Sequence, residues 1–178
     1  MATVFIGGSR GVLSLPAAVA RRFDGLIAKD FLVLVGDANG ADKAVQSYLS
    51  KHEYRNVEVF CSGPSPRNNL GGWPLRCIPA NRARGSLVEF YMAKDRAMTD
   101  EATAGLMVWN GRSAGTLANV FRLLGQEKPV AVYAMAEKQF HDLQSLGQWD
   151  EFIARCAVPL RREVERRASR GQCGPVVA

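Results

Sequence analysis

The sequence predicts an α/β protein: a three-layer sandwich with a mostly parallel sheet of five or six strands and helices on both faces. Three observations lead to this prediction. Short apolar runs without polar alternation recur along the chain, and such runs are typical of parallel strands covered on both faces. Amphipathic helical patterns lie between them, which favours repeated strand–helix units. Small-residue turns follow three of the runs, and in such sheets ligands bind beyond the carboxyl ends of the strands.

The expected strands and helices alternate from the N-terminus onward. Strands are predicted at residues 3–6, 31–35, 57–60, 106–109 and 129–133, with a short sixth strand at the edge over 140–143. Helices are predicted to begin near Pro16, Ala41, Ser86, Ser113 and Ser145, and a charged helix is predicted over 161–170. Glu89 follows Ser86, and Gln148 follows Ser145, at the spacing of a capping box, which supports two of these helix starts.

The chain is expected to form one domain over residues 1–158, followed by a basic C-terminal tail over 159–178. Residues 61–85 contain four prolines and four glycines without a clear period, so a long functional or mobile loop is predicted there. The formal charge is +6, and basic residues concentrate in this loop and in the tail. They indicate either a polyanionic partner or a solvated surface whose arginines pair with nearby acids.

Several classes of protein are not expected. No run of about eighteen apolar residues is present, so no membrane span is predicted. The N-terminus lacks the pattern of a signal peptide, which makes a cytoplasmic location the expectation. Cys61, Cys77, Cys156 and Cys173 show no C-x-x-C pair, so neither a metal site nor a disulfide framework is expected. His52 and His141 are isolated, and no Walker A, H-E-x-x-H or G-x-S-x-G motif occurs.

The strongest functional signal is the stretch from Leu106 to Thr116. A strand pattern runs into a small-residue turn, and apolar residues at helical spacing follow at once. The first backbone N–H groups of a helix lack internal partners and lie at the positive end of its dipole, so a helix start without bulky side chains can bind an anion. We therefore predict that Ser113, Gly115 and Thr116 form a phosphate seat, with Gly111 in the turn before it.

A second turn, formed by Gly8, Ser9 and Arg10, follows the first predicted strand. Its glycine permits a ligand to approach the backbone closely, and its guanidinium can bind a phosphate or a carboxylate. A glycine turn after a strand can equally be structural. The turn is therefore a candidate ligand contact that needs support from its neighbours.

A third turn contains Gly36, Asp37 and Gly40 and leads to Asp42 in the first turn of the next helix. Asp42 either interacts with the helix dipole as a structural residue or faces the sugar of the ligand. All three turns are expected at the carboxyl edge of the sheet. Their shared edge predicts a common ligand site.

Two further pairs of residues are candidates for the same site. Lys94 and Asp95 flank the apolar face of a predicted helix, so they either face solvent or look over the sheet edge into the site. Trp109 and Asn110 end the fourth predicted strand. The indole either stacks on a base or packs in the core.

Four motifs occur in one order along residues 3–133: Ile6-Gly-Gly-Ser-Arg10, Gly36-Asp-Ala-Asn-Gly-Ala-Asp42, Lys94-Asp-Arg-Ala-Met98 and Trp109-Asn-Gly-Arg-Ser-Ala-Gly-Thr116. With these motifs the chain resembles the SLOG superfamily, the Rossmann-like group that includes the DNA-processing protein A and Lonely Guy families. The resemblance implies a Rossmann-like fold and a nucleotide or nucleotide-derived ligand. It is strongest at the last motif, which is similar to the phosphate turn of Lonely Guy proteins.

The resemblance implies several activities. Some members hydrolyse the N-glycosidic bond of nucleoside monophosphates, others sense nucleotide signals, and one branch binds single-stranded DNA. The hydrolases carry Gly-Thr-x-x-Glu, but this chain has Asn119 in place of the glutamate. A neutral amide cannot act as base or nucleophile, nor stabilise a developing positive charge. An N-glycosidase or nucleoside (deoxy)ribosyltransferase would therefore need a carboxylate from Asp42 or Asp95.

The sequence thus predicts a nucleotide-binding protein, with N-glycosidic hydrolysis as a possible activity. The alternatives are a non-catalytic sensor of a nucleotide signal and a nucleic-acid-binding module that uses the arginine-rich loop and tail. A homodimer is expected from the resemblance, and no cofactor, metal or membrane partner is expected. The predicted ligand contacts are Gly8, Ser9, Arg10, Gly36, Asp37, Gly40, Asp42, Lys94, Trp109, Asn110, Gly111, Ser113, Gly115 and Thr116, and the predicted catalytic residues are Asp42 and Asp95.

Overall fold

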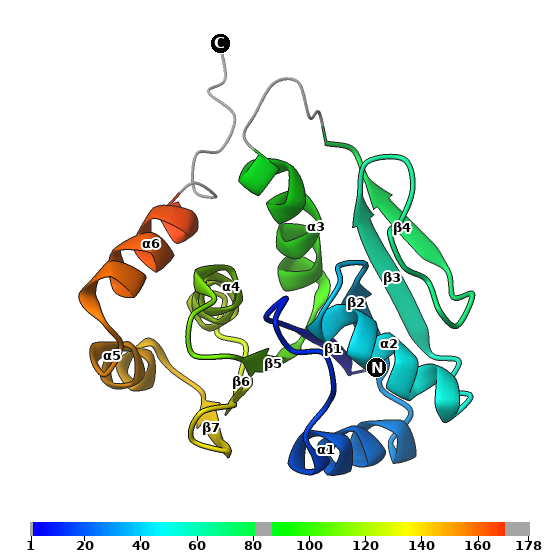
Figure 1. The fold of residues 1–178 in the computed structure, drawn as a ribbon, viewed down its shortest axis with the longest axis horizontal. Coiled ribbons are helices and arrows are strands. Elements are labelled where there is room, and N and C mark those ends of the chain that lie inside the picture. The colour runs from blue at the N-terminus through cyan, green and yellow to red at the C-terminus, as the bar shows by residue number, and fades with distance from the viewer. Residues whose placement is uncertain (1, 81–86, 170–178) are drawn as a thin grey trace.

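The computed structural model describes residues 2–80 and 87–169 and shows an α/β fold around one seven-stranded sheet (Figure 1). The strands are β1 (Thr3–Gly8), β2 (Leu32–Gly36), β3 (Val57–Ser62), β4 (Leu75–Ile78), β5 (Ala104–Trp109), β6 (Val130–Ala134) and β7 (Gln139–Leu143). Their order across the sheet is β4-β3-β2-β1-β5-β6-β7. All pairs are parallel except β6 with β7, which confirms the predicted mostly parallel sheet.

In the described ranges, six helices cover the two faces of the sheet. They are α1 (Ala17–Ala28), α2 (Ala41–Lys51), α3 (Leu87–Glu101), α4 (Ala114–Gly125), α5 (Leu146–Ala154) and α6 (Val158–Ser169). Alternate strand residues point to opposite faces, so β1 places Val4 and Ile6 in the core under α1 and α2 and Phe5 in the core under the other four helices. Two apolar cores on opposite faces confirm the three-layer arrangement.

One strand was not predicted. The segment 61–85, expected to be a loop, contains β4, so the sheet has seven strands where five or six were expected. Among the described residues the β4 strand pairs only with β3, and its first three residues are exposed. Because an edge strand buries little, its sequence Leu-Arg-Cys-Ile has no apolar run to reveal it. The predicted helix cap at Ser86 lies outside the described residues.

The glycines after the first apolar run continue the strand before the chain turns. Gly8 pairs with Val108 of β5, and a Cβ atom at Gly8 would lie 2.3 Å from the Val108 carbonyl oxygen and 2.9 Å from Ala41 Cβ. No side chain fits at this position without movement of the backbone. The absence of a side chain brings β1, β5 and the start of α2 together at one edge of the sheet.

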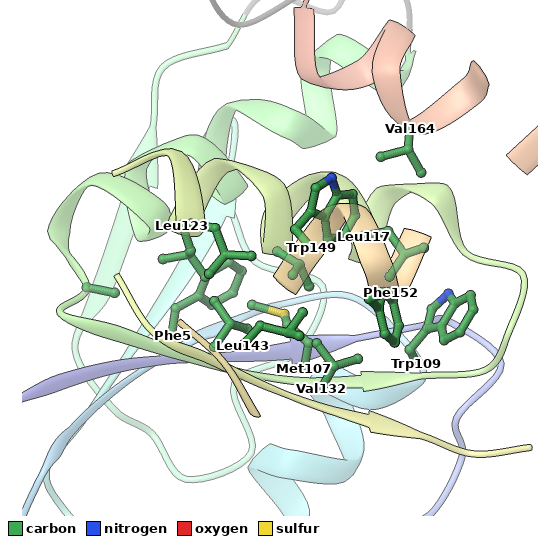
Figure 2. Packing of buried hydrophobic residues seen from close by; sticks show 14 of the residues in the cluster. Phe5, Met107, Trp109, Leu117, Leu123, Val132, Leu143, Trp149, Phe152 and Val164 are labelled. Atoms are coloured by element: carbon green, nitrogen blue, oxygen red, sulfur yellow. The ribbon is translucent and has the colours of Figure 1, made fainter. Parts of the chain in front are cut away.

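The last helix packs against the body of the fold. It begins at Val158, one residue before the segment 159–178 that the sequence assigns to a basic tail, and ends within that segment at Ser169. Val164 is buried in the same core as Trp149 and Phe152 (Figure 2), and the Arg122 side chain of α4 donates a hydrogen bond of 2.8 Å to the Arg167 carbonyl. Within residues 2–80 and 87–169, no helix is long and apolar enough to span a bilayer.

Candidate functional site

A cleft with a volume of about 1130 Å³ opens at the carboxyl ends of β1 and β5. The chain leaves β1 towards α1 on one face and leaves β5 towards α4 on the other. Neighbouring strands whose connections diverge in this way form the switch point at which open α/β sheets bind ligands. The predicted residues that line the cleft are Gly8, Arg10, Asp42, Lys94, Asp95, Trp109, Asn110, Gly111, Ser113, Gly115 and Thr116.

The start of α4 forms one wall of the cleft. Ser113 caps the helix, because its Oγ accepts hydrogen bonds from the Thr116 backbone N–H at 3.3 Å and from the Thr116 hydroxyl at 2.9 Å. The backbone N–H groups of Ala114 and Gly115 have no acceptor among the described residues. Two free donors at the positive end of a helix make this wall suited to an anion.

The turn before α4 is held in place by side chains. Asn110 Oδ1 accepts hydrogen bonds from the backbone N–H groups of Arg112 and Ser113, at 3.0 Å and 3.1 Å. Ser9 Oγ accepts from the Asn110 N–H at 3.1 Å and lies 3.2 Å from Thr116 Oγ1. Ser9 is only 1% exposed and lies outside the cleft lining, so it fixes the position of the turn from behind.

Three other predicted contacts also lie behind the cleft surface: Gly36, Asp37 and Gly40. Both oxygens of Asp37 bind Arg67: Oδ1 accepts from Nη2 at 2.7 Å, and Oδ2 accepts from Nε and from the backbone N–H at 3.0 Å each. Although burial raises the pKa of Asp37, the hydrogen bonds from Arg67 outweigh burial and hold it below its usual value. This pair secures the segment after β3 to the end of β2.

A buried charge cluster forms the floor of the cleft. Lys94 is 4% exposed, and its Nζ lies 2.9 Å from Asp95 Oδ1 and 3.4 Å from Asp42 Oδ2. Asp42 also accepts a hydrogen bond from the Ala38 backbone N–H at 3.1 Å. A Cβ atom at Gly36 would lie 2.2 Å from Asp42 Oδ2 and 2.3 Å from Lys94 Nζ, so only glycine leaves room for this cluster.

The two carboxylates of the cluster have different environments. Burial raises the pKa of Asp42, and the charge of Lys94 offsets only part of that rise. Burial also raises the pKa of Asp95, but attraction to Lys94 and hydrogen bonds from Lys94 and Asn119 outweigh it, so this pKa falls below its usual value. Burial would lower the pKa of Lys94, whereas its two acidic neighbours raise it. Asp95 is therefore ionised at neutral pH, and Asp42 is the easier of the two to protonate.

Asn119 has a structural role in this cluster. Its Nδ2 donates to Asp95 Oδ2 at 3.2 Å, and its Oδ1 accepts from Arg122 Nη1 at 2.8 Å. The amide thus links the carboxylate of α3 to the guanidinium of α4. Asn119 therefore orients Asp95 at the cleft.

Several cleft residues were not predicted from the sequence. Arg67 is one of them: its guanidinium lies 4.5 Å from the ring centroid of Tyr91, over which the predicted Arg10 also lies, at 5.2 Å. Arg155 and Arg167 line the cleft from the end of α5 and from α6. They belong to segments that read as a loop, a solvent-facing helix surface or a tail, and a single sequence has no signal that brings such segments together.

The arginines of the cleft divide into paired and unpaired groups. Arg67 is paired with Asp37, and Arg167 donates to Glu163 at 2.6 Å. Arg10, Arg112 and Arg155 have no carboxylate within ion-pair distance in the described part of the chain. Three guanidinium groups without an ion pair among the described residues therefore line the same cleft as the start of α4.

Trp109 lies at the boundary between the core and the cleft. It is 6% exposed, and its ring meets Phe152 edge to face, with centroids 5.7 Å apart. Its indole Nε1 has no hydrogen-bond partner among the described residues, and Figure 2 shows this nitrogen facing the side of the sheet covered by α5 and α6. A buried donor without an acceptor is costly, so a ligand atom or a water molecule is needed beside it.

Within the described ranges, no three His, Cys, Asp or Glu side chains gather as a group that could hold a metal ion. Comparison of the chain with protein-family models, with curated proteins and with solved structures gives no significant match. The functional argument therefore rests on the geometry and the charges of the cleft.

Proposed function

We propose that this protein binds a nucleotide, with a phosphate on the free backbone N–H groups of Ala114 and Gly115. One observation carries the proposal: these donors face a cleft that also contains unpaired arginines and the unpartnered indole N–H of Trp109. A phosphate supplies the acceptors that the helix start lacks. The arginines can add charge-assisted hydrogen bonds to it.

The rest of the cleft suits the remaining parts of a nucleotide. Asp42 and Asp95 line the floor and can accept hydrogen bonds from sugar hydroxyls. The side bounded by Trp109, Phe152 and Leu160 is apolar and suits a base. Polar and apolar groups on either side of one anion seat favour a nucleotide over a simple inorganic anion.

The nucleic-acid-binding alternative has less support. Arg76 of β4 is paired with Glu58 and Glu101, and both Arg166 and Arg167 of α6 are paired with Glu163. Paired arginines cannot release many counterions on binding a polyanion, so they supply little of the driving force that such proteins use. In the described part of the chain, internal pairing therefore accounts for part of the basic character of these segments, while Arg161 and Arg162 of α6 have no ion pair there.

Gly115→Asp tests the phosphate seat directly. We expect its dissociation constant for the best-binding nucleotide to rise at least about 100-fold, because a carboxylate at this position occupies the seat and repels phosphate. An acidic residue in the first turn favours the helix dipole, so the variant should remain folded. Isothermal titration against AMP, ADP, ADP-ribose and NAD measures the change.

Gly25→Asp is the matched control, because Gly25 lies on exposed α1 with nothing within 4 Å of a Cβ atom there. It should bind as the unaltered protein does. Unchanged affinity in a folded Gly115→Asp protein, or no binding of any nucleotide by the unaltered protein, would overturn the proposal.

A second candidate function is hydrolysis of an N-glycosidic bond, favoured by two carboxylates that share Lys94 while their pKa values move in opposite directions. Two carboxyl groups whose pKa values move apart can take the two roles that such hydrolysis needs, one as a charged carboxylate and the other as a proton donor. Ionised Asp95 would stabilise positive charge on the sugar, and protonated Asp42 would donate a proton to the departing base. Asn119 would keep Asp95 in position.

Asp95→Asn separates catalysis from binding. We expect the rate at which free base is released from the nucleotides that bind to fall by at least about 1000-fold, as measured by chromatography. Nucleotide affinity should change little, because the variant keeps the phosphate seat and loses only the charge of the carboxylate. Asp150→Asn, on the exposed surface of α5, is the control and should keep full turnover. Equal turnover in both variants would show that Asp95 has no role in the reaction. If the unaltered protein releases no base, the protein binds the nucleotide without hydrolysing it.

A further inference from the structure

Two cysteines lie side by side at the edge of the sheet, away from the cleft. Cys61 of β3 and Cys77 of β4 are paired residues in the parallel ladder, and their sulfur atoms are 3.1 Å apart. Neighbouring strands are about 4.8 Å apart, which lies within the range of Cα separations that a disulfide spans. The sulfurs need to approach by only about 1 Å to reach bonding distance.

The two thiols differ in access. Cys77 is exposed, and Cys61 is buried. Burial raises the pKa of Cys61 to about 12, and the thiol of Cys77 beside it adds to the rise. Because the thiolate is the reactive form, Cys61 does not react first with an oxidant from solution. Cys77 meets the oxidant, and Cys61 is the neighbour that can resolve the product.

We propose that Cys61 and Cys77 form a redox modification site that a peroxide converts to a disulfide. The Cys77 sulfur attacks the peroxide, the O–O bond breaks, and a sulfenic acid and one water molecule result. The Cys61 sulfur then displaces the hydroxyl group of Cys77, its proton leaves with that group as a second water molecule, and the S–S bond forms. Two thiols are oxidised and one hydrogen peroxide is reduced to two water molecules.

The bond would close a loop that reaches the cleft. The segment between the two cysteines contains Arg67, which binds Asp37, and Asn68, whose Nδ2 donates to the Asp37 carbonyl at 2.8 Å. The edge strand β4 pairs with β3 alone. A disulfide would therefore fasten the free edge of the sheet and the base of the loop that holds Arg67 against Tyr91.

The test uses the full chain with Cys156→Ser and Cys173→Ser, so that only this pair can react. After treatment with hydrogen peroxide we expect a mass loss of about 2 Da that dithiothreitol reverses, a linked peptide pair containing Cys61 and Cys77, and a rise in Tm of roughly 5–10 °C. Adding Cys77→Ser should abolish all three effects. A gain of oxygen mass on Cys77 without a linked peptide, or two thiols that stay titratable after treatment, would overturn the proposal. Neither outcome bears on nucleotide binding.

Discussion

Lys94→Met is expected to lower the free energy of unfolding at neutral pH by about 3–5 kcal/mol, because it removes one partner of a buried ion cluster. Lys94 is 4% exposed, and its ammonium is the cation that both Asp42 and Asp95 contact. Methionine has a similar volume, so the loss comes from two buried carboxylates without a counter-charge and not from a cavity. Urea unfolding followed by circular dichroism measures the difference.

The loss should depend on pH in one direction. Asp95 has a pKa below its usual value of 3.8, so its stabilising contribution is present above that value and disappears as pH falls through the lower folded value. Without Lys94 both carboxylates are expected to protonate more readily, which removes their charge. The difference between the two proteins should therefore shrink as pH falls from neutral, and should be smallest below the usual pKa of 3.8, where the contribution of Asp95 is also lost.

Lys43→Met is the matched control, since Lys43 is exposed on α2. We expect its unfolding free energy to change by less than about 0.5 kcal/mol at any of these pH values. A Lys94→Met protein as stable as this control, or a loss that grows on acidification, would show that the cluster is not held by the lysine charge.

Gly40→Ala is expected to cost about 3 kcal/mol or more, because backbone strain and overpacking combine at this residue. Gly40 has φ of 86° and ψ of −130°, a conformation that L residues rarely adopt. A Cβ atom there would lie 2.2 Å from the carbonyl oxygen of Arg10 and 2.5 Å from its Cα. The clash is with backbone, so the turn after β1 must move, and nucleotide affinity should fall together with stability.

Gly125→Ala provides the contrast. Gly125 is the last residue of α4 and has nothing within 4 Å of a Cβ atom. The substitution should raise the free energy of unfolding by about 0.5 kcal/mol, because alanine loses less backbone freedom on folding than glycine does. Thermal and urea unfolding of both variants test the pair, and a Gly40→Ala protein as stable as the unaltered protein would contradict the close approach of the two turns.

Much of the fold follows from local patterns. Strands β1, β2, β5 and β6 are apolar runs without polar alternation, as burial on both faces of a parallel sheet requires, and β3 differs only by Glu58 among its first four residues. The start of α4 near Ser113 was also predictable, because serine is one of the preferred residues immediately before a helix. The position of the three turns at the carboxyl edge of the sheet then follows from the parallel topology alone.

The remaining parts of the site depend on contacts between distant segments. Arg67 reaches the cleft because Asp37 binds it, and Arg167 does so because α6 packs on α4. Lys94 is charged, and its pattern on α3 gave no preference between solvent and interior. Its burial is possible because Asp42 of α2 adds its charge to that of the neighbouring Asp95 and Gly36 of β2 leaves space, and no local pattern reveals these two distant contacts.

The central claim is that a ligand phosphate binds the free N–H groups at the start of α4. The most direct measurement is a titration of the isotope-labelled protein with the best-binding nucleotide, followed through the backbone amide chemical shifts. The account predicts that the amide signals of Ala114 and Gly115 move downfield and saturate at the dissociation constant obtained by calorimetry. Saturable binding that leaves these two amides unmoved would contradict it.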